Sequence, residues 1–345
     1  MFARQKNTKA YIYILISAIS VFLLVNVSLT GCGTSGHFNF PDVSPTAEPT
    51  AEPTAEPTEE PTAEPTAEPT EGPTMRPTES PSVDPDYEEA ELTGFEYDNE
   101  TARASFNESS LLAQMGYTGT VDGLGDNTEC HLYKDGEEVT VLNIPETFER
   151  DGRTCRITGI GAYALCYCNY LKSITIPDSV ASIGMGAFSY CSSVTSLKLP
   201  EGVTFIDEGA FSFCHSLTSM VIPEGISVIK SGLLINCTSL TSVTLPDSVT
   251  VIEDYAFQSC TALPSIRIPE GVTSIGESAF FNCASLPTVT IPDGVSSLGP
   301  FSFYYCAELA SISWRGTLYT DNTVFNNAVK EAGVADEIVW SRRFE

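Results

Sequence analysis

A 23-residue period constrains this chain more than any other feature of its sequence. Within residues 171–308 a proline recurs at this spacing from Pro177 to Pro292, and a cysteine column with the same spacing runs from Cys168 to Cys306. Aligned on these positions, the unit reads roughly L-x-x-I-x-I-P-[DE]-[GS]-V-x-x-I-x-x-x-A-F-x-x-C-x-x. A repeat this short must stack on its neighbours to bury its apolar face, so the period predicts a solenoid.

Each part of the unit predicts a short element. L-x-x-I-x-I-P, as in residues 171–177, predicts a strand that points its Leu and Ile inward and ends at the proline. V-x-x-I, as in residues 180–183, predicts a second short strand, and A-F-x-x-C, as in residues 187–191, about one helical turn. Stacked at ~4.8 Å per turn, the repeats and their flanking turns would make a body ~40 Å long.

The recurring proline, Ala-Phe pair and cysteine resemble the bacterial surface-antigen (BspA-type) leucine-rich repeats, also known from treponemes, over residues 141–314. Departures are local: Leu233-Leu234 and Ser302-Phe303 each replace one Ala-Phe pair. That family usually carries a hairpin insertion at the start of the solenoid, for which Asp151-Gly152 provides a turn here. The resemblance implies a leucine-rich-repeat solenoid of 23-residue repeats, with short parallel strands and short helical turns. It also implies a role in binding host or matrix proteins or other bacteria.

Both ends of a solenoid expose apolar core and therefore need caps. Residues 92–140 alternate weakly at 95–106, 115–121 and 130–133, which predicts an N-terminal β cap. Residues 315–345 predict a C-terminal cap with a closing strand at 337–340 and a helix at 323–332. One face of that helix would carry Val324, Phe325, Ala328 and Val329.

The first 31 residues predict a targeting segment. Arg4, Lys6 and Lys9 precede an apolar run over residues 11–29, and the run ends in Leu-Thr-Gly-Cys32, which resembles a bacterial lipobox. That resemblance implies cleavage before Cys32 and acylation of this cysteine, which would anchor the chain to the bacterial membrane with its folded part outside the cytoplasm. The alternative is an uncleaved transmembrane helix.

Residues 32–91 predict a disordered stalk. From residue 41 to residue 85 every fourth residue is proline, mostly in Thr-Ala-Glu-Pro, with no apolar periodicity to bury. In polyproline II form the segment would reach on the order of 140 Å. Residues 41–91 carry 15 acidic residues and one Arg, a net charge of −14, which is half of the −28 of the whole chain. This balance argues against nucleic acid as a partner.

The chain has 11 cysteines, a number that outside the cell would normally predict disulfides. The seven-membered cysteine column instead predicts buried thiols that act as small hydrophobes, because their Cβ vectors would point the same way. Cys130, Cys155 and Cys166 stand outside that column. A Cys130–Cys155 bridge and a zinc site at Cys166 and Cys168 remain as weaker alternatives.

The sequence offers no recognisable catalytic site. His37, His131 and His215 have no nucleophile at a familiar spacing, and no phosphate loop, dinucleotide glycine pattern or zinc-protease motif is present. We therefore expect a protein that is not an enzyme and that needs no cofactor or metal.

A partner would contact the side chains that stand at the outward positions of the first strand in each repeat. One column holds Ser173, Ser196, Ser219, Ser242, Ser265 and Thr288, and the other holds Thr175, Lys198, Val221, Thr244, Arg267 and Thr290. These columns are either a plain solvated sheet or a hydrogen-bonding platform for an unknown extracellular protein or glycan. In the second column Lys198, Val221 and Arg267 interrupt the hydroxyls, and the two cations around an apolar spot would suit an acidic protein segment or a sialylated glycan. The alternative whole-protein role is a structural surface protein without one dedicated receptor.

Directly after each strand-ending proline stands an acidic residue. We call these the acidic column: Asp178, Glu201, Glu224, Asp247, Glu270 and Asp293. It either serves turn formation alone or forms a weak divalent-cation stripe.

Overall fold

The computed structural model describes residues 88–98, 103–122 and 128–341. The hydrophobic leader, the predicted lipid-attachment residue Cys32 and the Thr/Ala/Glu/Pro segment lie outside these residues. Within the described part of the chain, no helix is long and apolar enough to cross a membrane.

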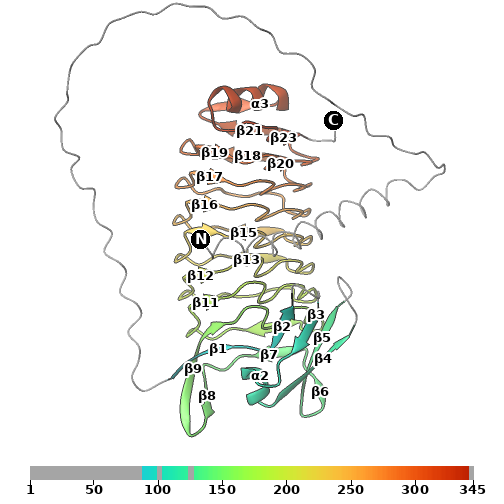
Figure 1. Ribbon diagram of the computed structural model, residues 1–345. Coiled ribbons are helices and arrows are strands. Elements are labelled where there is room, and N and C mark those ends of the chain that lie inside the picture. The colour runs from blue at the N-terminus through green and yellow to red at the C-terminus, as the bar shows by residue number, and fades with distance from the viewer. Residues whose placement is uncertain (1–87, 99–102, 123–127, 342–345) are drawn as a thin grey trace, which may run out of the picture. The chain divides into compact units, whose positions relative to one another are not determined.

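The N-terminal part consists of small antiparallel sheets around a single helical turn (Figure 1). The paired elements are β2 (Phe95–Asp98) with β3 (Arg103–Phe106), and β4 (Tyr117–Asp122) with β5 (Glu129–Lys134) and β6 (Glu137–Glu138). Between them, α2 (Leu111–Gln114) is capped by the Ser110 hydroxyl, which accepts from the Ala113 amide at 3.2 Å. The expected strands are present here, whereas α2 had no clear sequence signal.

The N-terminal part meets the solenoid at β9 (Arg153–Ile160), which pairs antiparallel with β8 (Thr147–Arg150). Asp151 (φ 53°) and Gly152 (φ 74°) form the tight turn of this hairpin, as predicted. On its other side β9 pairs in parallel with β1 (Glu88–Leu92). Strand structure thus starts four residues before the predicted boundary at residue 92. The boundary was misplaced because three of the five residues of β1 are Glu, which reads as a continuation of the acidic segment.

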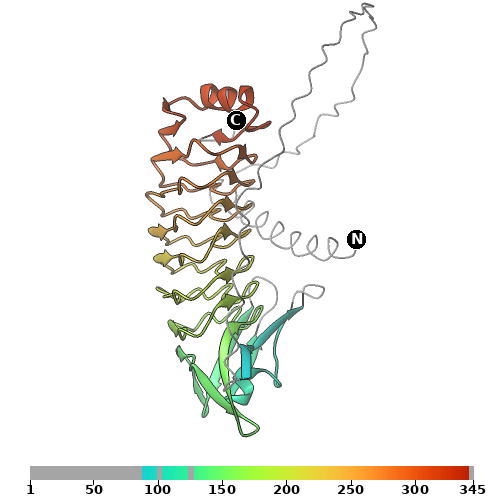
Figure 2. The same ribbon diagram turned by 90° about the vertical axis from the view of Figure 1, so that its left-hand side faces the viewer.

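Two ladders of short parallel strands run along the solenoid (Figures 1 and 2). The first ladder contains β7 (Val141–Asn143), β10 (Ser173–Thr175), β13 (Ser219–Val221), β15 (Ser242–Thr244), β18 (Thr288–Ile291) and β21 (Ser311–Trp314). The second contains β11 (Ser182–Ile183), β12 (Phe205–Ile206), β14 (Val228–Ile229), β16 (Val251–Ile252), β17 (Ser274–Ile275) and β19 (Ser297–Leu298). Ser219 pairs with Ser242, and Val228 with Val251, so each pair joins equivalent positions of adjacent repeats. The predicted repeat solenoid is confirmed.

The third side of each repeat differs from the predicted helical turn. Gly186 (φ 58°) and Tyr190 (φ 61°) are both left-handed, and a helix cannot continue through such residues. The amides alternate instead: Ser189 N–H donates within the turn to the Gly186 carbonyl at 3.0 Å, and Phe188 N–H donates to the Ala210 carbonyl of the next repeat at 2.9 Å. The A-F-x-x-C segment therefore forms a third hydrogen-bonded contact between repeats. Among the described residues only α2 and α3 are α-helical.

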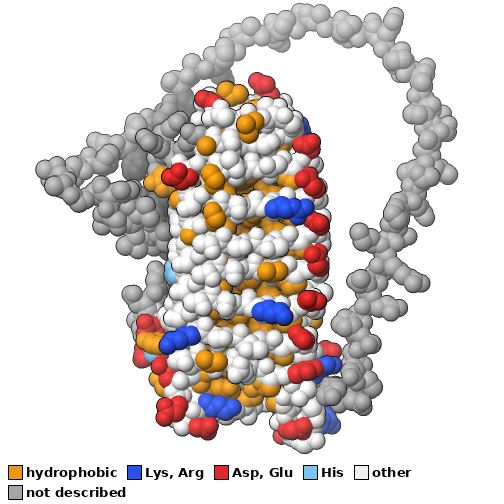
Figure 3. Space-filling model, turned by 180° about the vertical axis from the view of Figure 1, so that it is seen from behind, with side chains coloured by type: hydrophobic (Ala, Val, Ile, Leu, Met, Phe, Trp, Pro, Cys, Tyr) orange, Lys and Arg blue, Asp and Glu red, His pale blue; other side chains and the backbone are white. Residues whose placement is uncertain are grey.

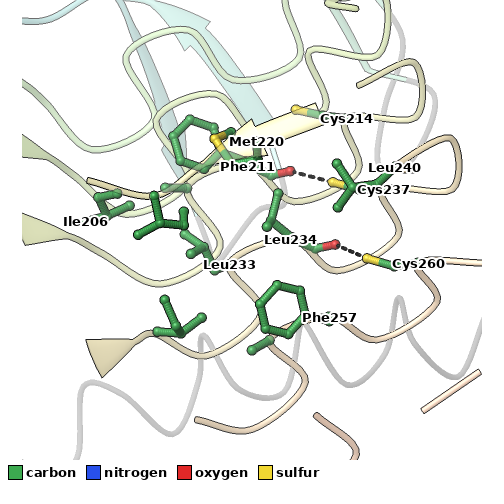
Figure 4. Packing of buried hydrophobic residues seen from close by; sticks show 14 of the residues in the cluster. Ile206, Phe211, Cys214, Met220, Leu233, Leu234, Cys237, Leu240, Phe257 and Cys260 are labelled. Atoms are coloured by element: carbon green, nitrogen blue, oxygen red, sulfur yellow. Dashed lines mark hydrogen bonds between the residues drawn. The ribbon is translucent and has the colours of Figure 1, made fainter. Parts of the chain in front are cut away.

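The core holds a stack of phenylalanines beside the cysteine column (Figure 4). The rings of Phe257 and Phe280 are 5.1 Å apart and nearly parallel, and Phe303 continues the stack at 5.1 Å. Leu234 stands at the equivalent position between Phe211 and Phe257, so the stack of rings is interrupted there.

Six thiols of the column make a contact that the sequence did not predict. Each donates to a carbonyl 26 residues earlier, for example Cys237 to Phe211 at 3.2 Å and Cys260 to Leu234 at 3.3 Å. The other four donors, each bonded at 3.2 or 3.3 Å, are Cys191, Cys214, Cys283 and Cys306. The buried thiols are therefore polar links between repeats as well as small hydrophobes. All ten cysteines of the described residues are free, so the Cys130–Cys155 bridge considered above is not formed.

The C-terminal end closes with a hairpin and a helix. β21 turns back at Arg315 (φ 48°) and Gly316 (φ 72°) into β22 (Thr317–Tyr319), a strand that the sequence analysis missed. In α3 (Asn322–Glu331), Phe325 and Val329 are buried, but Val324, expected on the same face, is 57% exposed. Val324 is next to Phe325 in the helix, and consecutive residues are about 100° apart around a helix axis, so Val324 points away from the face that buries Phe325 and Val329. The closing strand is β23 (Trp340–Ser341), which pairs in parallel with β20 (Phe303–Tyr304).

Replacing Phe257 by Ala should lower the free energy of unfolding by ~3 to 5 kcal/mol, because the fully buried ring leaves a cavity between repeats. Urea denaturation measures this loss. The exposed Val221→Ala serves as a control and should leave the denaturation midpoint nearly unchanged. A loss below ~1 kcal/mol for Phe257→Ala would contradict the stacked core.

The buried thiols should make the folded protein less stable at alkaline pH. Burial raises the pKa of Cys214 from 9.0 to about 12, so between these values the folded state holds a proton that the unfolded state releases. The free energy of unfolding should therefore fall as pH rises above 9, by up to ~1.4 kcal/mol per pH unit for each such thiol. Melting temperatures at pH 8 to about 10.5 for the wild type and Cys214→Ala test this. The variant should show the shallower decline, and parallel curves would refute the assignment.

Candidate strand-face site

The two outward columns of the first ladder all lie on one exposed face, which we call the strand face. Figure 3 shows a largely uncharged surface of the solenoid with Asp and Glu side chains in a column along one edge and a few separate Lys or Arg side chains. Parallel pairing keeps equivalent positions adjacent, as for Val221 and Thr244 or for Thr175 and Asn143. Thr175 donates its hydroxyl to Asn143 Oδ1 at 2.9 Å, so part of the hydroxyl chemistry is satisfied within the face.

The first ladder is interrupted at the two repeats that carry the cations. Residues 196–198 make only an isolated bridge, between Ser196 and Ser219. At the repeat of Arg267, residue 264 is proline and has no amide hydrogen, whereas the equivalent Thr241 donates to the Thr218 carbonyl at 2.9 Å. These interruptions make the face less uniform than the sequence period suggests.

A shallow hollow of about 370 Å³ lies at the first interruption. Its lining includes the stem of Lys198, the side chains of Val221 and Pro223, and Glu201 at the turn. Val221 is 62% exposed, which is unusual for an aliphatic side chain in the middle of a regular repeat. Within the described residues Lys198 has no ion-pair partner. The hollow thus combines an exposed apolar wall with a cation that is available to a ligand.

Arg267 is placed differently from Lys198. Its guanidinium donates to Asp247 Oδ1 at 2.7 Å, and this hydrogen bond raises the pKa of Arg267. The partner belongs to the acidic column of the preceding repeat. Both residues are well exposed, so the pair is worth little to stability, yet it occupies the charge of Arg267. The structure therefore favours Lys198 over the expected pair of equivalent cations.

The acidic column lies on the turns, and all six of its residues are exposed. In each repeat the proline carbonyl accepts from the amide three residues later, as Pro177 does from Val180 at 3.1 Å, which is the geometry of a β-turn. Within the described ranges, no group of three or more His, Cys, Asp or Glu side chains is arranged to hold a metal ion. The turn role of these acidic residues therefore has direct structural support.

His131 belongs to a polar cluster that the sequence analysis did not find. Its Nδ1 lies 2.7 Å from Glu138 Oε1, and its ring is 4.3 Å from that of Tyr170. Tyr170 in turn donates to Glu129 Oε2 at 3.1 Å. Because Tyr170 belongs to the solenoid and the other three residues to β5 and β6, the cluster fastens the N-terminal sheet to the first repeat.

The two strand ladders, the third set of hydrogen bonds between repeats and the columnar core define a leucine-rich-repeat solenoid. The family described as "BspA type Leucine rich repeat region" matches residues 154–263 and 228–331, together more than half of the chain. The chain therefore belongs to the BspA-type leucine-rich-repeat family. Residues 41–86 also match the "PT disordered repeat".

Three solved structures of bacterial leucine-rich-repeat proteins are similar to this chain. A protein from Treponema pallidum is 29% identical, with a TM-score of 0.48, and the match covers 59% of this chain and 87% of that one. A cell surface protein from Faecalibacterium prausnitzii is 28% identical (TM-score 0.40, coverage 58% and 69%). A protein from Bacteroides ovatus is 26% identical (TM-score 0.41, coverage 56%), and only 63% of its own length is matched. No curated protein matches. A leucine-rich-repeat domain points to a protein-binding or structural role at a surface.

Proposed function

We propose that this protein is a surface-displayed, membrane-anchored binding module whose strand face contacts a protein partner through the hollow at Lys198 and Val221. The observation that carries the proposal is the exposed Val221 beside a cation without an ion-pair partner in the described residues, on a face otherwise lined by small hydroxyls. Such a site offers a partner both the burial of apolar surface and a charge-assisted hydrogen bond. The predicted site residues Thr244, Thr290 and Thr175 would form its polar surroundings.

The chemistry of the hollow favours a partner segment with an acidic side chain next to an aliphatic or aromatic one. Lys198 is a cation on a protein whose overall charge is −28, so an acidic ligand would be repelled elsewhere and attracted here. Glu201 at the edge of the hollow would reject a second acidic group. A sialylated glycan is the other candidate for the same cation, but the apolar wall of Val221 suits a protein side chain better.

The alternative is a structural surface protein without one dedicated receptor. The regular Ser and Thr columns favour it, because small hydroxyl side chains are also what a merely solvated strand requires.

Binding tests the two roles. The chain from residue 33 onward should be immobilised and offered extracellular matrix proteins and bacterial surface proteins one at a time. Lys198→Ser should weaken binding of any partner found by ~1 kcal/mol or more, about fivefold, without changing the melting temperature. Arg267→Ser is the matched control, because Asp247 already occupies its charge, and it should have a smaller effect.

If Lys198→Ser and Arg267→Ser both bind the partner as tightly as the wild type does, the binding site lies on another face. Failure of every purified partner would favour the structural role.

Anchoring is the second part of the proposal and rests on the leader and the Leu-Thr-Gly-Cys32 sequence. Cys32→Ser should abolish incorporation of a labelled fatty acid and leave the precursor uncut, because both reactions need the thiol. Labelling and gel mobility in a bacterial host measure this, with Cys130→Ser as a control that should be acylated normally. Normal acylation of Cys32→Ser would rule out Cys32 as the lipid-attachment residue, and a wild type that is neither acylated nor cut would favour the uncleaved transmembrane helix.

A further inference from the structure

The hollow on the strand face lies where two neighbouring repeats of the first ladder separate. The two repeats still meet at the bridge between Ser196 and Ser219. Two positions further along, the backbone of Val221 has no hydrogen-bond partner in residues 197–199 of the described structure. Residues on both sides of this gap line the hollow.

The regular part of the ladder shows which hydrogen bonds are missing at the gap. Ile222 N–H donates to the Thr244 carbonyl of the next repeat at 3.0 Å. Because alternate residues of a parallel strand bond to opposite neighbours, the amide and the carbonyl of Val221 both face the preceding repeat. There the equivalent bond, from Leu199 N–H to the Val221 carbonyl, is not formed within the described residues. The bond from Val221 N–H to the Leu197 carbonyl is not formed there either.

The gap therefore presents backbone donors and acceptors that have no partner among the described residues. The donors are the amides of Leu199 and Val221, and the acceptors are the carbonyls of Leu197 and Val221. The side chains of Leu197 and Leu199 are only 7% and 6% exposed, so these residues border the hollow mainly with their backbone. A ligand group that supplies matching hydrogen bonds would remove the cost of leaving these backbone groups unpaired.

We propose that this gap binds the primary carboxamide of an Asn or Gln side chain in an extended segment of the protein partner. The inference rests on the proposed function, because it names the group that the same hollow accepts. A primary carboxamide has two N–H donors and one carbonyl oxygen with two lone pairs, which match two backbone carbonyls and two backbone amides. A carboxylate has no donor for the carbonyls, and a secondary amide, such as the acetamido group of a sugar, has only one.

The hollow then selects two different side chains of the partner segment. The carboxamide enters the gap, and an acidic side chain of the same segment reaches the ammonium group of Lys198. An acidic group in the gap itself would face the unpaired carbonyls, with Glu201 at the edge of the hollow. The gap therefore favours a neutral hydrogen-bonding group, whereas Lys198 favours a negative charge.

The first test concerns the gap in the free protein. In the full-length protein, isotope-labelled at Leu, Val and Ile, hydrogen exchange followed by NMR should show the Leu199 and Val221 amides exchanging at least ~10-fold faster than the Ile222 amide. Ile222 is an internal control, because its amide is bonded to the Thr244 carbonyl. Equally slow exchange of all three amides would show that the strands are paired and would overturn the proposal.

The second test offers the same protein three small probes: butyramide, butyrate and N-methylbutyramide. Butyramide should shift the amide resonances of Leu199 and Val221 at about tenfold lower concentration than the other two, because each of these leaves at least one backbone carbonyl without a donor. The Ile222 resonance should stay in place. Equal responses to the three probes, or no response to butyramide, would overturn the proposal. A stronger response to N-methylbutyramide and to N-acetylglucosamine would also overturn it and would assign the gap to a glycan.

Failure of this inference and failure of the proposed function give different results, because the probes need no partner. A selective butyramide response in a protein that binds none of the purified partners would support the carboxamide site and count against the proposed binding role. A partner that binds through Lys198 without changing the exchange or the resonances of Leu199 and Val221 would overturn the carboxamide site and leave the binding role standing.

Discussion

Hydrogen bonding between equivalent backbone positions of adjacent repeats is the constraint on which the rest of this structure depends. A single turn has no interior, and its Leu, Ile and Phe become buried only when the next turn covers them. The paired strands Ser219–Val221 and Ser242–Thr244 and the alternating amides around Phe188 fix that stacking on separate sides. With the register fixed, identical residues meet along each column. Small hydroxyls therefore align on the strand face, carboxylates on the turns, and rings and thiols in the core.

The sequence predicted what depends on the period. The solenoid, its inward Leu and Ile residues and the Asp151–Gly152 hairpin all follow from patterns that local chemistry determines. Contacts that form only between stacked repeats could not be predicted from the sequence. The thiol-to-carbonyl bond of Cys237 joins residues 26 apart whose contact appears only after stacking. The A-F-x-x-C segment was misread because a short apolar run suits a helical turn and a tight left-handed turn equally well. At the ends, where the period stops, β1 and β22 gave little signal.

The candidate site shows the same division. Alternation along the first strand correctly predicted which side chains face solvent, including Lys198, Val221 and Arg267. It did not separate the two cations, because the partner of Arg267 is a turn residue of the preceding repeat, 20 positions away. Nor did it predict the hollow, which depends on the irregular stacking of residues 196–198. On a repeat scaffold, the residues that depart from the regular pattern thus distinguish a candidate binding surface. A consensus of the repeats does not contain these residues.

The thiol-to-carbonyl bonds have a consequence for how such a gene can change. Each cysteine finds its acceptor in a preceding repeat at the same relative position, as Cys260 does at Leu234 and Cys283 at Phe257. If recombination deletes or duplicates one whole repeat, every donor meets an equivalent acceptor in its new neighbour, and the core is rebuilt with the same contacts. Loss of part of a repeat would move the whole downstream chain out of register. The length of the solenoid can therefore vary during evolution in whole repeats, and the distance between its two ends with it.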